Sequence, residues 1–327
     1  MDLFEKNILE SNRQLGRNGL TALNLRKLSG RKPDGIVILG MGGSNLPGEI
    51  LRSVRRELGL GNLPVILWKD YDLPDIGEWR LKRPLYVFIS FSGNTEEPVS
   101  GLAEFLKNKK RVPAVVAHGG KMESLARRHG LPLVLFPAAD LNPRQYTGRM
   151  FYGLLEVLRA SGLALRGEWD FTGLSPARSR NAGRALARKL RNKVVVIYTD
   201  EGNRHLGYIW KIKLNETSKN LAFANILPEM NHNEIVGFER KGSAVAALFI
   251  HDRTGGRLEK RIKITQKILA EKGATVVLLV PAGRTALERT WRSIMLADWT
   301  SFYLAKLNRV EPAPVRIVER LKKLMAA

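Results

Sequence analysis

Short apolar runs alternate with longer segments of helical periodicity along almost the whole chain of 327 residues. In the first half, five runs rich in Val, Ile, Leu and aromatic residues have the length of strands buried on both faces: 35–39, 64–68, 85–90, 112–117 and 132–136. Segments with apolar residues at helical spacing follow or separate these runs, at 48–58, 99–107, 121–128 and 147–161. This alternation predicts an α/β fold in which helices flank a parallel sheet.

The second half repeats the pattern. It contains three further predicted strands, 193–198, 244–250 and 274–280, and helices at 203–215, 257–271, 285–307 and after Pro314. Each half opens with a strand, a glycine-containing loop and a helix, which is typical of a duplicated α/β unit. The aperiodic stretch 162–183 is interpreted as the connection. We therefore expect an N-terminal domain at 1–161, a connecting segment at 162–192 and a C-terminal domain at 193–327.

The charge balance limits the classes of ligand. The chain has 54 Lys and Arg against 31 Asp and Glu, a net charge of +23, which is typical of proteins that bind nucleic acids, membrane surfaces or small anions. The basic residues are spread over many predicted helices without an interleaved aromatic motif, so no specific nucleic-acid partner is expected. The absence of cysteine excludes disulfides, thiolate metal sites and thiol catalysis. With no secretory signal and no apolar run near the ~20 residues of a membrane span, we expect a cytoplasmic protein without a membrane partner.

Two loops in the first half favour a phosphate site. Residues 40–44 (GMGGS) follow the first predicted strand, residues 90–95 (SFSGNT) follow the third, and each loop precedes a helix. Both loops emerge at the carboxyl edge of a parallel sheet, where glycines and helix N-termini accept anions. They contain neither a P-loop lysine nor a dinucleotide fingerprint. Hydroxyl groups of Ser and Thr would bind the phosphate in place of the lysine, although the same residue types are also common helix N-caps. The candidate phosphate ligands are Gly43, Ser90, Ser92 and Thr95.

The segment 210–237 concentrates polar groups in an apolar context, which is costly unless they are paired or used. Glu216 lies at the predicted C-terminal end of a helix and is the candidate general base. From the residues alone, the more common interpretation is a solvated helix-end charge for Glu216 and a structural histidine for His232. Four other histidines have no partner pattern and are interpreted as structural: His118, His129, His205 and His251. Because no HxH, HExxH or Cys–His spacing occurs, we expect no metal site.

Several blocks together resemble one family. They are GMGGS at 40–44, SFSGNTEE at 90–97, GGK…LARRHGLPLV at 119–134, NPRQYTGRMF at 142–151, WKIKLNETSKNLAFANILPEMNHNEIVGFE at 210–239 and DWTSFYLAKLNRVEPAPVRIVERLK at 298–322. In this order they resemble the bifunctional phosphoglucose/phosphomannose isomerase family, within the phosphoglucose isomerase superfamily. The resemblance implies two SIS (sugar isomerase) subdomains and an aldose–ketose isomerase that interconverts fructose 6-phosphate with glucose 6-phosphate and mannose 6-phosphate without a cofactor.

The resemblance also implies roles for individual residues. Ser44 joins Ser90, Ser92 and Thr95 in the sugar-phosphate site, and Glu216 corresponds to the base that moves a proton through a cis-enediol. The remaining matches are His232 and Lys306 for ring opening, Arg144 for the enediolate and Thr300 for acceptance of mannose 6-phosphate. The last block departs from the family, since VEPAPV replaces the usual Gly-x-Asp-Pro-Thr pattern. The histidine of the family comes from the neighbouring subunit, which implies a homodimer with its active site at the subunit interface.

Three alternatives stay open at this level. A non-catalytic SIS module that senses a sugar phosphate would need the two loops but not Glu216, Arg144 and His232 together. The other two are an isomerase restricted to glucose 6-phosphate and an isomerase that acts on an amino-sugar phosphate.

Overall fold

The computed structural model describes residues 2–107, 111–137, 142–166, 171, 173–240, 244–252 and 255–325. The chain divides into two compact units, each of which is described by itself. The N-terminal unit consists of Glu10–Leu174 and Thr285–Leu287, and the C-terminal unit consists of Met1–Leu9, Ser175–Arg284 and Glu288–Ala327. The first nine residues thus group with the second half of the chain, and the change from one unit to the other lies between Leu174 and Ser175.

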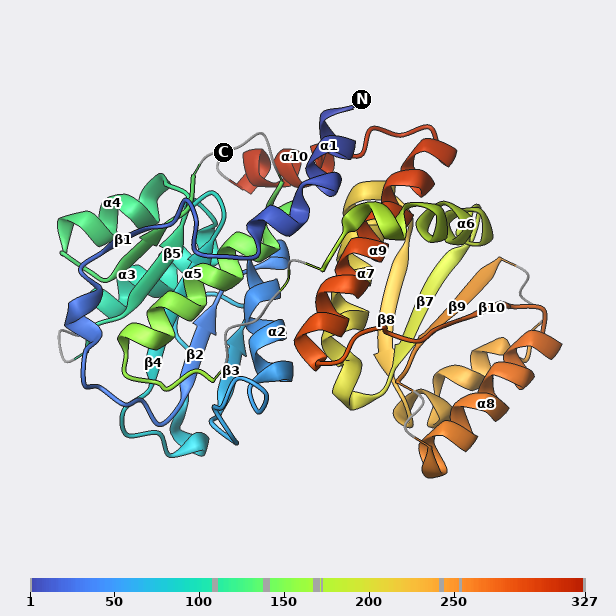
Figure 1. The fold of residues 1–327 in the computed structure, drawn as a ribbon, viewed down its shortest axis with the longest axis horizontal. Coiled ribbons are helices and arrows are strands. Elements are labelled where there is room, and N and C mark those ends of the chain that lie inside the picture. The colour runs from blue at the N-terminus through green and yellow to red at the C-terminus, as the bar shows by residue number, and fades with distance from the viewer. Residues whose placement is uncertain are drawn as a thin grey trace. The chain divides into compact units, whose positions relative to one another are not determined.

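The N-terminal unit contains a six-stranded sheet of order β1-β6-β5-β4-β2-β3 (Figure 1). Its strands are β1 Thr21–Leu23, β2 Ile36–Leu39, β3 Val65–Trp68, β4 Leu85–Ser90, β5 Ala114–Ala117 and β6 Leu133–Leu135. All neighbours pair in parallel except β1, which runs antiparallel to β6. The five strands predicted from the sequence are confirmed. The sixth, β1, has only three residues and two of them are exposed, so its sequence lacks an apolar run.

Helices cover both faces of this sheet. The helices α3 (Glu96–Lys107) and α4 (Gly120–Arg128) bury Leu102, Phe105 and Met122 against one face. On the other face lie α2 (Leu46–Val54) and α5 (Thr147–Ala160). Here Gly48 and Gly153 approach strand side chains so closely that a Cβ atom would meet Leu67 at 2.7 Å and Val116 at 2.8 Å. The predicted layering of helices about a parallel sheet is therefore confirmed.

The C-terminal unit contains a second sheet of order β10-β9-β7-β8, in which all strands are parallel. Its strands are β7 Val194–Thr199, β8 Ala222–Ile226, β9 Val245–Ile250 and β10 Thr275–Leu279. The edge strand β8 was not predicted, because its alternation of buried and exposed residues is weak. The helices are α1 Leu3–Leu9, α6 Arg180–Leu190, α7 Arg204–Ser218, α8 Gly256–Glu271, α9 Ala286–Leu307 and α10 Arg316–Met325. Of these, α6 lies inside the segment predicted as a connection.

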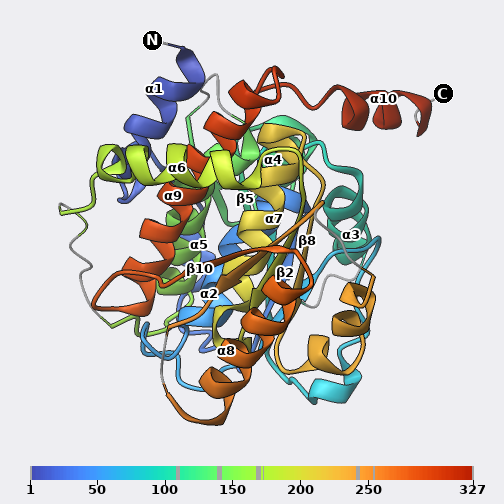
Figure 2. The ribbon, with the colours of Figure 1, turned by 90° about the vertical axis from the view of Figure 1, so that its right-hand side faces the viewer.

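The C-terminal sheet is also packed on two sides. Ile262 and Leu269 of α8 are buried with Tyr198 and Phe249 of the strands in one apolar cluster. The helix α7 lies against the sheet through Gly207, where a Cβ atom would meet Thr199 at 3.1 Å. Figure 2 shows α10 at the end of the chain, extending away from α9. Within the described ranges, no helix combines the length and the apolar character that crossing a bilayer requires.

In both sheets the order of the strands reverses at a central strand, so that the chain connections on its two sides run in opposite directions. In the N-terminal unit β2 lies between β3 and β4, and in the C-terminal unit β7 lies between β8 and β9. Such a switch point opens a crevice beyond the carboxyl ends of the two diverging strands, where α/β proteins bind ligands. The loops after β2 and β4, and those after β7 and β9, therefore occupy equivalent positions in the two units.

Candidate functional site

The two predicted phosphate loops meet at the switch point of the N-terminal sheet. Ser44 lies in the 3₁₀ helix Gly42–Asn45 that follows β2, and its Oγ accepts a hydrogen bond from the N–H of Phe91 in the loop after β4, at 2.9 Å. The side chain of Asn45 donates to the carbonyl of Gly40 at 2.8 Å and closes the first loop on itself. Ser44 and Asn45 are buried, so both bonds are shielded from water. The two loops are thus joined by a direct hydrogen bond.

Hydroxyl groups shape the second loop from within. Ser90 and Thr95 bond to each other through their hydroxyl oxygens at 2.9 Å, and Ser90 Oγ also accepts the N–H of Gly93 at 3.1 Å. Ser90 is fully buried, whereas Ser92 is exposed and Thr95 is partly exposed. Ser92 Oγ accepts the N–H of Asn94 at 3.2 Å. This arrangement leaves Ser92 and Thr95 as the hydroxyls best exposed to an anion, with Ser90 holding the turn in shape.

A third loop, which sequence reasoning did not include in the site, supports the second one. The N–H of His118 donates to Phe91 O at 3.1 Å, and the N–H of Met122 donates to Gly93 O at 2.9 Å. Gly93 has a φ of +66°, and a Cβ atom there would lie 1.7 Å from the carbonyl oxygen of Gly119. Only glycine fits this position. The sequence signal for the contact was the glycine pair at 119–120, where α4 begins.

Arg144 reaches the same region through the backbone. It lies in the 3₁₀ helix Pro143–Gln145, immediately before α5, and it is fully buried. A Cβ atom at Gly43 would be 2.9 Å from the backbone nitrogen of Arg144, so the first glycine loop and this turn are in direct contact. Thr147 fixes the turn by donating its hydroxyl to Arg144 O at 3.2 Å. Gly43, Ser44, Ser90, Ser92, Thr95 and Arg144 are therefore gathered at one edge of the N-terminal unit.

Glu216 lies in the last turn of α7, as predicted from the sequence. The helix ends at Lys219, which has a φ of +51° and whose Nζ donates to Glu216 O at 2.8 Å. Glu216 itself is partly buried. A partly buried carboxylate at a rigid helix end can accept and return a proton, which is the chemistry expected of a general base.

Three polar contacts between α7 and α9 fix the helix that carries Glu216. His205 Nε2 lies 2.9 Å from Thr290 Oγ1, and Trp210 Nε1 donates to Ser293 Oγ at 2.9 Å. Nearest to Glu216, the ammonium group of Lys213 lies 2.5 Å from Asp298 Oδ1. All six side chains are buried. The contacts occur along most of the length of α7, so they determine both its rotation and its position along α9.

His232 and its acidic neighbours lie in the segment that follows β8. His232 ends the 3₁₀ helix Glu229–His232 and is exposed. Glu234 accepts the hydroxyl of Tyr198 at 3.1 Å and a bond from the side-chain amide of Asn225, which ties this segment to the sheet. Burial, together with the charge of Glu234, raises the pKa of Tyr198 well above its usual range. Glu234 is thus a structural residue that holds this segment on the sheet.

The two candidates on α9 have contrasting environments. Thr300 is fully buried, donates its hydroxyl to Leu296 O at 2.7 Å, and has its backbone nitrogen 3.0 Å from where a Cβ atom of Gly183 in α6 would lie. Lys306 is exposed, with Nζ 4.4 Å from the centre of the Phe302 ring. In this arrangement Thr300 belongs to the packing between α6 and α9, and Lys306 belongs to the surface.

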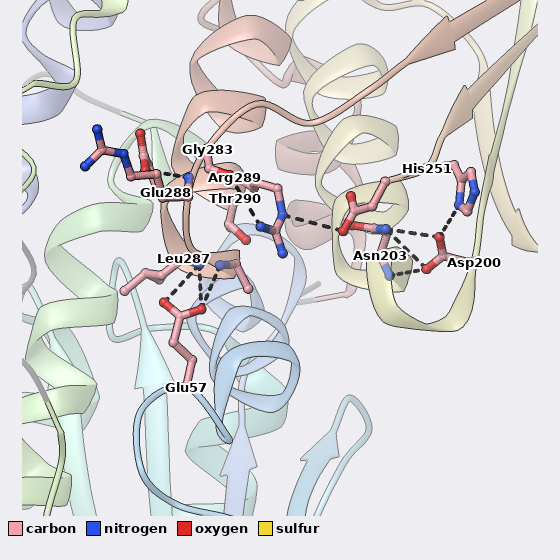
Figure 3. Close-up of polar contacts among 12 residues, drawn as sticks. Glu57, Asp200, Asn203, His251, Gly283, Leu287, Glu288, Arg289 and Thr290 are labelled. Atoms are coloured by element: carbon pink, nitrogen blue, oxygen red, sulfur yellow. Dashed lines mark hydrogen bonds and ion pairs between the residues drawn. The ribbon is translucent and has the colours of Figure 1, made fainter. Parts of the chain in front are cut away.

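A histidine interpreted as structural from the sequence lies at the switch point of the C-terminal sheet. His251 follows β9, is buried, and its Nδ1 lies 2.8 Å from a carboxylate oxygen of Asp200, which follows β7 (Figure 3). Asp200 also accepts the backbone N–H of Asn203 at 2.9 Å and caps the turn that leads into α7. Fifty-one residues separate the pair, so only the strand order could have indicated it. Among the described residues, no group of three or more His, Cys, Asp or Glu could hold a metal ion.

Known proteins resemble this chain in sequence and in fold. The bacterial phospho-glucose isomerase C-terminal SIS domain family matches residues 179–325. The bifunctional phosphoglucose/phosphomannose isomerase of Aquifex aeolicus is 31% identical over 293 residues, covering 88% of this chain and 89% of that protein. The D-glucosamine-6-phosphate 4-epimerase of Sulfolobus acidocaldarius is 26% identical over 301 residues, covering 88% of each chain. The crystal structure of glucosamine-6-phosphate deaminase from Thermotoga maritima superposes with a TM-score of 0.66 at 18% identity, over 95% of this chain and 96% of that one, and shows the likeness of fold.

Proposed function

Because the chain belongs to the bifunctional phosphoglucose/phosphomannose isomerase family and is therefore an isomerase, we propose that it interconverts fructose 6-phosphate with glucose 6-phosphate and mannose 6-phosphate. The observation that carries this proposal is the similarity to the Aquifex aeolicus enzyme over 88% of the chain and 89% of that enzyme. A non-catalytic sensing module is not favoured, because it would not require a partly buried carboxylate on a rigidly held helix end.

The phosphate ester of the substrate binds at the loops after β2 and β4. The exposed hydroxyl of Ser92, that of Thr95 and the N–H groups at the start of α3 are suitable donors for a phosphate dianion. Ser44 and Ser90 act by keeping the loops in shape, which is supported by their hydrogen bonds to the N–H groups of Phe91 and Gly93. The site needs no magnesium ion, because hydroxyls and backbone N–H groups supply the donors.

Glu216 transfers the proton between C1 and C2. Once the ring has opened, the carbonyl group makes the hydrogen on the adjacent carbon acidic. In the direction from glucose 6-phosphate, Glu216 takes the proton from C2, a cis-enediol forms, and Glu216 returns the proton to C1. Mannose 6-phosphate differs only at C2, so the same base serves both sugars when the C2–C3 bond rotates. Arg144 would stabilise the developing oxyanion, a role that typically contributes about 3–4 kcal/mol.

His232 and Lys306 move the ring-opening proton between O1 and O5. The exposure of His232 supports its use by a neighbouring subunit, as in the family, and so supports a homodimer with composite active sites. Lys306 is also exposed and has the mobile ammonium group that such a role needs. The assignment of Thr300 to mannose acceptance stays a prediction, and any such effect would act through the packing of α9 against α6.

The test is an isomerase assay that starts from fructose 6-phosphate, with glucose 6-phosphate and mannose 6-phosphate separated by anion-exchange chromatography and measured individually. The expected result is formation of both sugars by the wild-type protein and of neither by Glu216→Gln. Formation of glucose 6-phosphate alone would restrict the proposal to that sugar, and formation of neither would overturn it. The second candidate function is isomerisation of an amino-sugar phosphate, which the similarity to the Sulfolobus acidocaldarius epimerase favours. A parallel reaction with glucosamine 6-phosphate tests it.

A further inference from the structure

The C-terminal helix α10 presents a stripe of apolar side chains to water. Ile317, Leu321 and Leu324 are spaced as neighbours on one helix face, and they are 82%, 57% and 65% exposed. Val318 and Met325, at the edges of the stripe, are also exposed, and none of the ten residues of α10 is buried. A helix of ten residues is marginal in water without tertiary packing. The stripe is therefore typical of a surface that another molecule covers.

The other face of α10 is basic. Arg316, Arg320, Lys322 and Lys323 outnumber the single acid, Glu319. A partner surface that suits this helix therefore combines apolar groups with negative charge. Two α10 helices would repel each other because both carry a positive charge, which disfavours pairing of the helix with its own copy.

The chain itself offers a surface of the complementary kind, in the N-terminal unit. Residues 70–79 (DYDLPDIGEW) contain four acids and residues 96–106 (EEPVSGLAEFL) contain three, and neither stretch contains a Lys or Arg. In a protein with a net charge of +23, such a concentration of acids is unusual. Two aromatic side chains on the first stretch, Tyr71 and Trp79, are 40% and 42% exposed. We call residues 70–79 and 96–106 the acidic-aromatic surface.

Hydrogen bonds hold the two stretches together as one surface. The hydroxyl of Tyr71 donates to Glu96 Oε2 at 3.3 Å, and the N–H of Asp72 donates to Ser100 Oγ at 3.2 Å. The N–H of Leu73 donates to Glu104 Oε2 at 2.8 Å. The loop 70–79 is thus attached along the side of α3, and its acidic groups and aromatic rings are presented in a fixed arrangement.

We propose that α10 of one copy of this chain docks on the acidic-aromatic surface of a second copy, with the apolar stripe against Tyr71 and Trp79 and the basic face against the acids. The complementarity of charge selects this occupant over a membrane, because an anionic lipid surface would leave the acidic-aromatic surface without a partner. In a symmetric pair the contact occurs twice, once for each α10. The proposal does not depend on the enzymatic activity, because it rests on exposure and charge alone.

The test uses two charge-reversed variants, Lys322→Glu/Lys323→Glu on α10 and Asp72→Lys/Asp75→Lys on the acidic-aromatic surface. Each variant alone brings like charges together, so its dissociation constant for self-association, measured by analytical ultracentrifugation, should rise at least about tenfold. When the two variants are mixed, both contacts pair opposite charges again, and a heterodimer should form with an affinity near that of the wild type. A matched control, Lys260→Glu/Lys267→Glu on the exposed face of α8, changes the net charge equally and should leave self-association unchanged.

Either of two results in the self-association experiment would overturn the proposal. One is a Lys322→Glu/Lys323→Glu variant that self-associates like the wild type. The other is a pair of weakened variants that fail to recover when mixed, since this recovery separates a lost contact from a misfolded helix. Flotation with vesicles of phosphatidylcholine and phosphatidylserine tests the membrane alternative, and binding of a monomer through α10 would also refute docking on a second copy. Isomerase activity is measured in parallel, because its loss without a change in self-association would concern the proposed function alone.

Discussion

The buried ion pair between Lys213 and Asp298 makes a quantitative prediction about the helix that carries Glu216. Lys213 and Asp298 have side chains only 1% and 6% exposed, with 2.5 Å between Nζ and Oδ1. Replacing Lys213 with Met keeps most of the side-chain volume but leaves the carboxylate of Asp298 buried beside an apolar group. Breaking such a pair from one side costs about 3–5 kcal/mol of unfolding free energy, whereas an exposed pair is worth about 1 kcal/mol or less.

The expected loss is large enough to measure directly. For a unit of this size, 1 kcal/mol corresponds to roughly 2–4 °C in Tm, so Lys213→Met should lower the Tm of the C-terminal unit by roughly 6–20 °C. The double variant Lys213→Met/Asp298→Leu removes both charges, and most of the lost stability should return, because neither charge is then buried. Thermal unfolding followed by circular dichroism gives the Tm of the wild type and the three variants of this cycle, including Asp298→Leu alone.

The matched control is Lys267→Met, which removes an exposed lysine from its pair with Glu271. Its effect on Tm should be within experimental error of zero. The reasoning is wrong if Lys213→Met costs no more than this control, or if the double variant loses as much stability as the two single variants added together. The same four proteins also show whether the pair positions Glu216, since kcat should fall in the double variant although its stability has returned.

Three further outcomes are expected. Gly93→Ala would force the loop after β4 away from Gly119 O, so KM for fructose 6-phosphate should rise at least about tenfold. The control Gly16→Ala, at a position with open space around it, should leave KM unchanged. An unchanged KM for Gly93→Ala would mean that the phosphate binds elsewhere. Ser44→Ala removes the acceptor of the Phe91 N–H and should cost about 1–3 kcal/mol in urea unfolding, and a loss below 0.5 kcal/mol, roughly the scatter of neutral surface changes, would contradict the role given to that bond. Burial raises the pKa of Tyr152 to about 12, against about 10 in the unfolded chain, so stability should fall as the pH rises from 10 to 12 because only the unfolded state loses this proton. Unfolding of Tyr152→Phe at several pH values should show a shallower fall, and an identical fall would refute the assignment.

The sequence predicted the elements with strong periodicity and missed those without it. The central strands β2, β4, β5, β7 and β9 are nearly all buried, so their apolar runs are continuous and unmistakable. The edge strands β1 and β8 are partly exposed and mix polar with apolar residues, so only their pairing with a neighbour defines them. The helix α6 was not predicted for a related reason. Its buried residues, Leu186, Ala187 and Leu190, are interrupted by basic residues, so they form no continuous apolar run.

The candidate site shows the same division between local and long-range signals. The position of Glu216 at a helix end and the pairing of the two loops follow from local sequence and from the rule that parallel strands share an edge. The bond from Phe91 to Ser44, the contact of Gly43 with Arg144 and the pairing of His251 with Asp200 join residues far apart in the chain. No local pattern encodes such contacts, since they depend on strand order. The sequence likewise did not indicate that Thr300 would be fully buried.

The central claim is that Glu216 carries a proton between C1 and C2, and the most direct test is isomerisation of fructose 6-phosphate in D₂O. A carboxyl group that exchanges with solvent should introduce deuterium at C2 of the product, visible by nuclear magnetic resonance, in the wild type and in the control Glu229→Gln. Glu216→Gln should lose both turnover and deuterium incorporation while it still binds fructose 6-phosphate in calorimetric titrations. Turnover that survives in Glu216→Gln, with or without deuterium in the product, would contradict the account.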